Sequence, residues 1–219
     1  MQLFNSTVGR KILMAITGQL MVLFVVVHLL GNSSIFIPGG INSYAEHLHA
    51  FPPLVWIFRL VMLLFVGTHA CYGIMITLEN NKANPGAYAV NRPLKATFSS
   101  RNMIWTGLLI MLFIAYHLCH FTARLTPDIV TKTLPNGGFD VFTMVVSSFQ
   151  HGLIAFLYVA AMVILFLHLN HGIQSFFQTM GWNNDCSMPI ISRVCKIIAV
   201  IFLVGYSAIP IIILARILT

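Results

Sequence analysis

Residues 149–175 read FQHGLIAFLYVAAMVILFLHLNHGIQS, an apolar stretch long enough to cross a lipid bilayer as one helix. Two histidines, His168 and His171, are the only ionisable side chains in its second half. An ionisable group at membrane depth is costly, so it usually faces a bundle interior and has a function. The stretch therefore predicts a membrane-spanning helix that contributes to a functional site.

Four other stretches have the same character, so five spans are expected, at about 11–31, 53–78, 102–123, 149–175 and 191–215. The whole chain agrees, because 58% of its 219 residues are hydrophobic and 8% are charged, where a soluble domain has about 25% charged residues. The first span is too long for a signal-peptide core and is expected to be retained. We predict one all-α integral membrane domain, 1–219, with a four-helix core and one peripheral helix.

The basic residues predict an orientation in the membrane. Eight lie at one end of the predicted helices and four at the other. The positive-inside rule then places the N-terminus in the cytoplasm and the C-terminus outside. This distribution anchors helices and does not suggest a nucleic-acid partner, despite the net charge of +7. The eight are Arg10, Lys11, Lys82, Arg92, Lys95, Arg101, Arg193 and Lys196; the four are Arg59, Arg124, Lys132 and Arg216.

Four histidines lie in four different spans at two depths. Counting residues from the span ends places His28 and His117 in the outer half, and His69 and His171 in the inner half. At 1.5 Å per residue the two levels are separated by about 10–15 Å. One intramembrane histidine is often a packing residue, but two pairs at matched depths predict a cofactor site. We expect His28 with His117, and His69 with His171.

Paired histidines on facing helices are typical of bis-histidine haem, in which both axial positions of the iron are filled and the iron transfers electrons. Two such pairs predict two haems b, with these four histidines as axial iron ligands. Small residues next to the ligands, such as Gly31, are expected to let the macrocycle approach the backbone. The four cysteines show no C-x-x-C spacing, which argues against an iron–sulfur cluster and against c-type haem.

Two doublets with H-x-x-H spacing leave the choice of ligand open. His117 with His120, and His168 with His171, each lie on one helix face, so His120 and His168 are alternative ligands. Such doublets also suit zinc or a proton path, which makes a histidine-based transporter an alternative function. The absence of a carboxylate near the doublets in the sequence argues against zinc.

A carboxylate in the outer connection is a candidate for quinol chemistry. Glu46 lies within the segment YAEHLH, 44–49, which predicts a short interfacial helix. Quinol oxidation releases protons and needs an acceptor within hydrogen-bond reach. We predict Glu46 as that acceptor, with His47 and His49 as alternatives.

Several motifs resemble one family across nearly the whole chain. They are STVGRK (6–11), HLLGN (28–32), NSYA (42–45), SRNMIWTG (100–107), YHL (116–118), HGI (171–173) and FQTMG (177–181). Together they resemble the cytochrome b membrane-anchor subunit of succinate dehydrogenase and fumarate reductase, in its single-subunit, five-helix, di-haem form. The resemblance favours His117 and His171 over their doublet partners.

The resemblance implies haem b at both levels and a membrane quinone, expected to be menaquinone, as substrate. It implies a flavoprotein and an iron–sulfur subunit on the cytoplasmic face of the cell membrane, and it allows a dimer of the whole complex. The dicarboxylate site would lie in those partners, because this chain has no FAD fingerprint. The fourth span departs from some relatives in having no acid, since Leu169 stands where one is expected. A nearby alternative is the di-haem quinone-reactive cytochrome b of a hydrogenase or formate dehydrogenase.

Overall fold

The computed structural model describes residues 6–83, 97–135 and 137–218. Arg92 and Lys95, which contribute to the predicted orientation, lie outside the described residues. The part of the chain that the structure describes forms helices, turns and one isolated bridge between Thr133 and Phe139. The prediction of an all-α fold is confirmed.

Among the described residues, five helical segments are long and apolar enough to span a membrane, as predicted. They are α2 (Thr7–Ser33), α4 (Pro52–Ala83), α6 (Met103–His117), α8 (Gly152–Thr179) and α9 (Met188–Leu214). Short segments continue two of them: the 3₁₀ turn η1 (Ser34–Phe36) follows α2, and the π-helical turn η2 (Leu118–Thr122) follows α6. The fourth span begins at Gly152 rather than at residue 149, because His151 adopts an extended conformation and ends the preceding helix.

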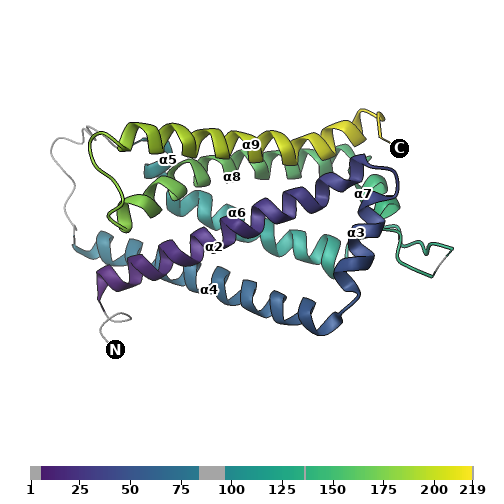
Figure 1. The fold of residues 1–219 in the computed structure, drawn as a ribbon, viewed down its shortest axis with the longest axis horizontal. Helices are drawn as coiled ribbons and strands as arrows, with labels where there is room; N and C mark the ends of the chain where they lie inside the picture. The colour runs from purple at the N-terminus through teal and green to yellow at the C-terminus, as the bar shows by residue number, and fades with distance from the viewer. Residues whose placement is uncertain (1–5, 84–96, 136, 219) are drawn as a thin grey trace.

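The spanning helices run alternately up and down, so the two ends of the chain lie at opposite ends of the molecule (Figure 1). Helices α2, α4, α6 and α8 pack in a ring, each against its two neighbours. Helix α9 packs along α8 and α2 outside this ring. The result is a four-helix core with one peripheral helix, which leaves an interior shared by four helices.

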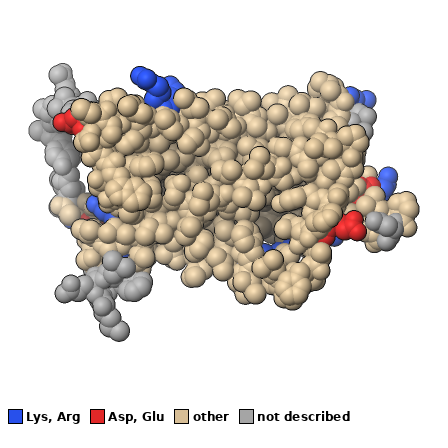
Figure 2. Space-filling view, in the orientation of Figure 1, with Lys and Arg blue, Asp and Glu red and all other residues tan. Residues whose placement is uncertain are grey.

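Charged side chains lie mainly towards the two ends of the molecule, and the face between them is almost free of charge (Figure 2). An ion pair between Arg10 and Glu79 joins α2 to α4 at one end. The spanning helices expose many large apolar side chains along their length. Such a surface is stable against lipid and not against water, so the protein is a multi-pass membrane protein.

Two short helices close the end of the molecule at which α2 ends and α9 terminates. Helix α3 (Gly40–His49) contains the predicted interfacial segment, and α7 (Val141–Phe149) lies in a region for which only a connecting segment was expected. Asp140 caps α7, accepting hydrogen bonds from the Thr143 amide at 3.1 Å and its hydroxyl at 2.6 Å. Asn42 of α3 bonds both Asp140 and the Phe142 amide.

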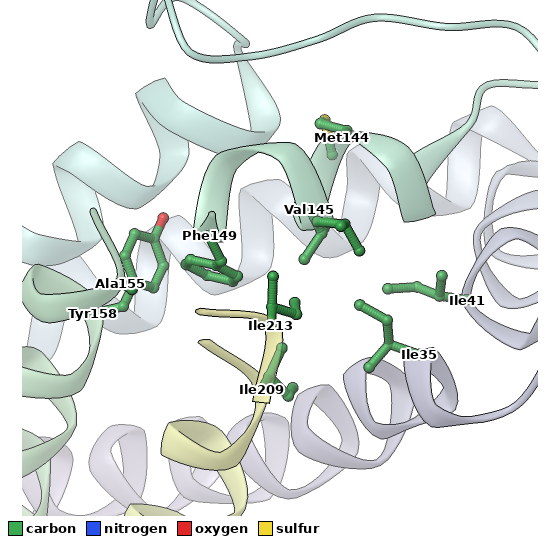
Figure 3. Packing of buried hydrophobic residues seen from close by; sticks show 10 residues of the cluster. Ile35, Ile41, Met144, Val145, Phe149, Ala155, Tyr158, Ile209 and Ile213 are labelled. Atoms are coloured by element: carbon green, nitrogen blue, oxygen red, sulfur yellow. The ribbon is translucent and has the colours of Figure 1, made fainter. Parts of the chain in front are cut away.

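A hydrophobic cluster holds these short helices against the bundle (Figure 3). Its side chains come from η1, α3, α7, α8 and α9, and they include Ile35, Phe149, Tyr158 and Ile213. Burying each such side chain contributes about 1.5–3 kcal/mol. The cluster thus fixes α7 against α8 at the level of Tyr158, which matters for the site described next.

Candidate functional site

The first histidine pair, called the outer pair after its predicted depth, consists of His28 on α2 and His117 at the end of α6. The ring centroids are 6.0 Å apart, and the ring planes are nearly perpendicular, at 86°. Phe24, one turn before His28, stacks on its ring at 5.2 Å. The Nδ1 atom of His117 lies 3.2 Å from the Tyr158 hydroxyl of α8. The two outer histidines that the sequence placed at one depth are therefore neighbours in space.

The inner histidine pair consists of His69 on α4 and His168 on α8. Their ring centroids are 6.2 Å apart with an interplanar angle of 70°. His69 Nδ1 donates to the Met14 carbonyl of α2 at 2.8 Å. His168 Nδ1 lies 3.1 Å from the Thr106 hydroxyl. That hydroxyl donates to backbone carbonyls one turn back, so its oxygen accepts the His168 proton.

His171, the ligand favoured by the resemblance, is not the residue that faces His69. Among the described residues, the ring contact of His69 on α8 is with His168 alone. Both members of the doublet lie on one side of α8, and the rotation of the helix about its axis decides which one meets the partner. The pairing of His69 with His171 stays a prediction, and the geometry favours the alternative ligand His168.

Two glycines that the sequence analysis did not single out let the inner rings approach the backbone. A Cβ atom at Gly18 of α2 would lie 2.9 Å from His69 Cε1, and one at Gly107 of α6 would lie 3.3 Å from His168 Cε1. Gly31, expected to make room beside His28, instead accommodates the ring of Tyr44, which would lie 2.5 Å from an added Cβ. The glycines that make room for the histidine rings are not those adjacent to them in sequence, because each ring packs against the glycine of a neighbouring helix.

The two pairs lie at separate levels. Tyr158 contacts the outer pair and His168 belongs to the inner pair, and both are on α8. His168 follows Tyr158 by ten positions, which corresponds to a rise of about 15 Å along the helix. The interior of the bundle therefore presents two histidine pairs, one above the other.

His120 is fully buried and makes hydrogen bonds through both ring nitrogens. Nδ1 lies 2.8 Å from the Tyr158 hydroxyl, and Nε2 lies 2.8 Å from Asp128 Oδ2. The Ser148 hydroxyl donates to the same carboxylate oxygen at 2.6 Å and lies 2.8 Å from Nε2. With both nitrogens engaged, His120 has no free lone pair for a metal.

Asp128 contacts His120, a member of one H-x-x-H doublet. The prediction that no carboxylate lies near the doublets is therefore wrong. Asp128 is only eight residues after His120, but the sequence does not show that the chain turns back there. The reversal follows the π-helical turn η2 and Arg124, which has a φ of 57°. Single π-helical turns are rare and often occur at functional sites.

The environment of Asp128 favours the carboxylate. Partial burial alone would raise the pKa of Asp128, but hydrogen bonds from Ser148 and His120 outweigh it and lower the pKa to about 2. Asp128 is thus an anion next to a buried imidazole at the end of the molecule that α3 and α7 close.

Glu46 lies on the exposed side of α3, on the same helix as His47 and His49. The two histidines donate Nδ1 protons to the Ser43 and Ala45 carbonyls, at 2.7 and 2.9 Å. Each therefore keeps a lone pair on Nε2 that can accept a proton. Glu46 and both alternatives are exposed on α3.

Taken together, the residues define a class of protein: a multi-pass helical membrane protein with two facing histidine pairs at different depths of a four-helix core. Across residues 6–83, 97–135 and 137–218, no group of three or more His, Cys, Asp or Glu side chains converges on one point. Within the described residues, each level therefore has two imidazoles and no third His, Cys, Asp or Glu that could bind the same metal ion.

Comparisons with models of protein families, with curated proteins and with solved structures found no match to this chain. The histidine pairs and the sequence motifs are therefore the features of this chain that bear on its function.

Proposed function

We propose that this chain is the di-haem cytochrome b membrane-anchor subunit of a succinate:quinone oxidoreductase or quinol:fumarate reductase. In this proposal it carries electrons between a membrane quinone, expected to be menaquinone, and a cytoplasmic iron–sulfur and flavoprotein pair. The observation that supports it best is the presence of two histidine pairs with centroid distances of 6.0 and 6.2 Å.

Those distances suit an iron atom between each pair. Metal–imidazole bonds of about 2 Å, with about 1 Å from each nitrogen to its ring centroid, require centroids about 6 Å apart. Direct packing of two rings also occurs at such distances, so the hydrogen bonds of the rings are a second, independent criterion.

Three of the four rings direct Nδ1 at an oxygen: His69 at Met14, His168 at Thr106 and His117 at Tyr158. A histidine that ligates a metal usually donates its other ring proton to such an acceptor, which fixes the tautomer and the ring plane. The lone pair of Nε2 is then free for the metal. The donor set therefore fits bis-histidine haem at both levels.

In this assignment His28 and His117 hold the outer haem b, and His69 and His168 hold the inner one. Haem b, when bound, would supply reversible one-electron chemistry. The chain itself orients the four imidazoles, sets their tautomers and excludes water with apolar helices. At the outer end, Glu46 is the proposed acceptor of the quinol proton.

The same geometry weighs against a metal transporter. Structural zinc takes four protein ligands and catalytic zinc usually takes three, whereas each level offers two imidazoles and the described residues hold no larger cluster. A di-haem cytochrome of a hydrogenase or formate dehydrogenase would use the same pairs, so its partners distinguish it.

The test is gentle purification from the native membrane, followed by a pyridine-haemochrome assay and identification of the subunits that co-purify. We expect two low-spin haems b per chain, together with a flavoprotein and an iron–sulfur protein. Substituting His28→Ala or His117→Ala should remove the same redox component. One haem or none in the wild-type protein would overturn the assignment, and hydrogenase or formate dehydrogenase subunits would establish the alternative.

A further inference from the structure

A continuous row of hydrogen bonds leads from the outer end of the protein to the outer histidine pair. Asp128 contacts His120 Nε2, His120 Nδ1 contacts the Tyr158 hydroxyl, and that hydroxyl contacts His117 Nδ1. The three distances are 2.8, 2.8 and 3.2 Å. The row joins a connecting loop, the π-helical turn, α8 and the last residue of α6.

The donor and acceptor properties of the side chains determine which one donates each hydrogen bond of this row. A carboxylate accepts hydrogen bonds and cannot donate them, so His120 donates from Nε2 to Asp128. With its proton on Nε2, the His120 ring accepts at Nδ1, and Tyr158 donates to it. The Tyr158 oxygen is left to accept the proton of His117 Nδ1. Every proton therefore points towards Asp128, and the lone pair of His117 is placed on Nε2.

We propose that Asp128, acting through His120 and Tyr158, is a positioning residue that holds His117 in the tautomer able to bind metal and raises the electron density of its ring. This inference rests on the proposed function, in which His117 is an axial ligand. The reverse direction of the row would put the His117 proton on Nε2 and block ligation.

The surroundings strengthen the coupling along the row. His120 is fully buried, and Phe121 stacks on it at 4.0 Å. Tyr158 lies in the hydrophobic cluster shown in Figure 3 and is almost fully buried. Hydrogen bonds in such apolar surroundings polarise one another more than in water. Within the described chain the ring of His28 makes no hydrogen bond, so polar control of the outer pair enters through His117.

The experiment is a redox titration of the purified, haem-containing complex with Asp128→Asn and with Tyr158→Phe. The outer component is identified as the one missing in His28→Ala. Removing the anion or the connecting hydroxyl lowers electron donation by His117, which destabilises the oxidised state. We expect the outer midpoint potential to rise in both variants, or the outer component to be lost, and the inner potential to stay unchanged.

Tyr206→Phe is the matched control. The ring of Tyr206 lies 6.1 Å from that of His28, but its hydroxyl donates to the Val25 carbonyl. Tyr206→Phe removes a hydrogen-bonded hydroxyl beside the same histidine pair without touching a ligand nitrogen. We expect both potentials to be those of the wild type. The double variant of Asp128 and Tyr158 should shift no further than Tyr158→Phe alone, because one row carries both effects.

An unchanged midpoint potential of the outer component in Tyr158→Phe overturns the inference. A shift of that potential in Tyr158→Phe with no shift in Asp128→Asn also overturns it. An equal shift in Tyr206→Phe would also overturn it, since any lost hydroxyl would then act alike. If Asp128→Asn fails to fold, the outer midpoint potentials of Tyr158→Phe and Tyr206→Phe are compared, and equal potentials in the two variants overturn the inference. Absence of haem from the wild-type protein would instead refute the proposed function.

Discussion

Gly18→Ala is the sharpest structural test of the inner histidine pair. The added Cβ would lie 2.9 Å from Cε1 and 3.0 Å from Nδ1 of His69, where carbon atoms normally approach to about 3.5–4.0 Å. The ring must therefore move away from α2 by more than about 0.5 Å. The acceptor of its Nδ1 proton, the Met14 carbonyl, lies on the same helix, so this movement stretches the 2.8 Å hydrogen bond.

The expected loss can be worked out from this contact. Losing such a supporting partner costs about 10-fold to 100-fold in metal affinity, which is about 1.4–2.7 kcal/mol. Alanine also favours the helical conformation over glycine by about 0.5–1 kcal/mol. Helix propensity therefore offsets part of the steric cost to the fold, and the main effect should fall on the ligand His69.

Haem content by pyridine haemochrome and a redox titration measure the effect. We expect Gly18→Ala to lose or weaken the inner component and to keep the outer one. Gly205→Ala is the control, because its Cβ would lie 2.9 Å from Leu29 Cδ2, an equally tight contact with no histidine. Two haems with unchanged potentials in Gly18→Ala would refute the reasoning, and so would inner-haem loss in Gly205→Ala.

Three further substitutions test the remaining assignments. His168→Ala should abolish the inner component while His171→Ala keeps it, measured by redox titration, and the opposite result would mean that α8 is rotated about its axis relative to this structure. Glu46→Gln should lower quinol-coupled turnover strongly while both haems and dye-linked turnover persist; normal turnover would move the search to the neighbouring histidines. The pKa of Asp128 is about 2 in the folded protein against 3.8 normally, so its carboxylate stabilises the fold above pH 4 and loses that effect as the pH falls from about 4 to about 2. Asp128→Asn should flatten this part of a curve of melting temperature in detergent against pH, and an unchanged slope would contradict the stabilisation of the carboxylate by its hydrogen bonds from Ser148 and His120.

Length and polarity along the chain were sufficient for the number of spans and for the histidines within them. A helix needs about 20 apolar residues to cross a bilayer. Such a stretch can be counted in the sequence without knowing which residues contact one another. The same reasoning placed His28 and His117 at one depth, because depth along a helix is a linear count. It also anticipated a short helix around Glu46.

Contacts between helices were beyond that reasoning, because they depend on rotation about each axis and on where the chain turns back. The H-x-x-H spacing of His168 and His171 is compatible with either residue facing His69, and only the packing of α8 against α6 and α2 places His168 there. The π-helical turn after His117 and the reversal at Arg124 bring Asp128 to His120. The sequence by itself determined a five-span helical protein with histidines at two depths. The tertiary structure alone decided which imidazoles meet and which groups orient them, since those relations depend on how each helix is rotated and on where the chain turns back.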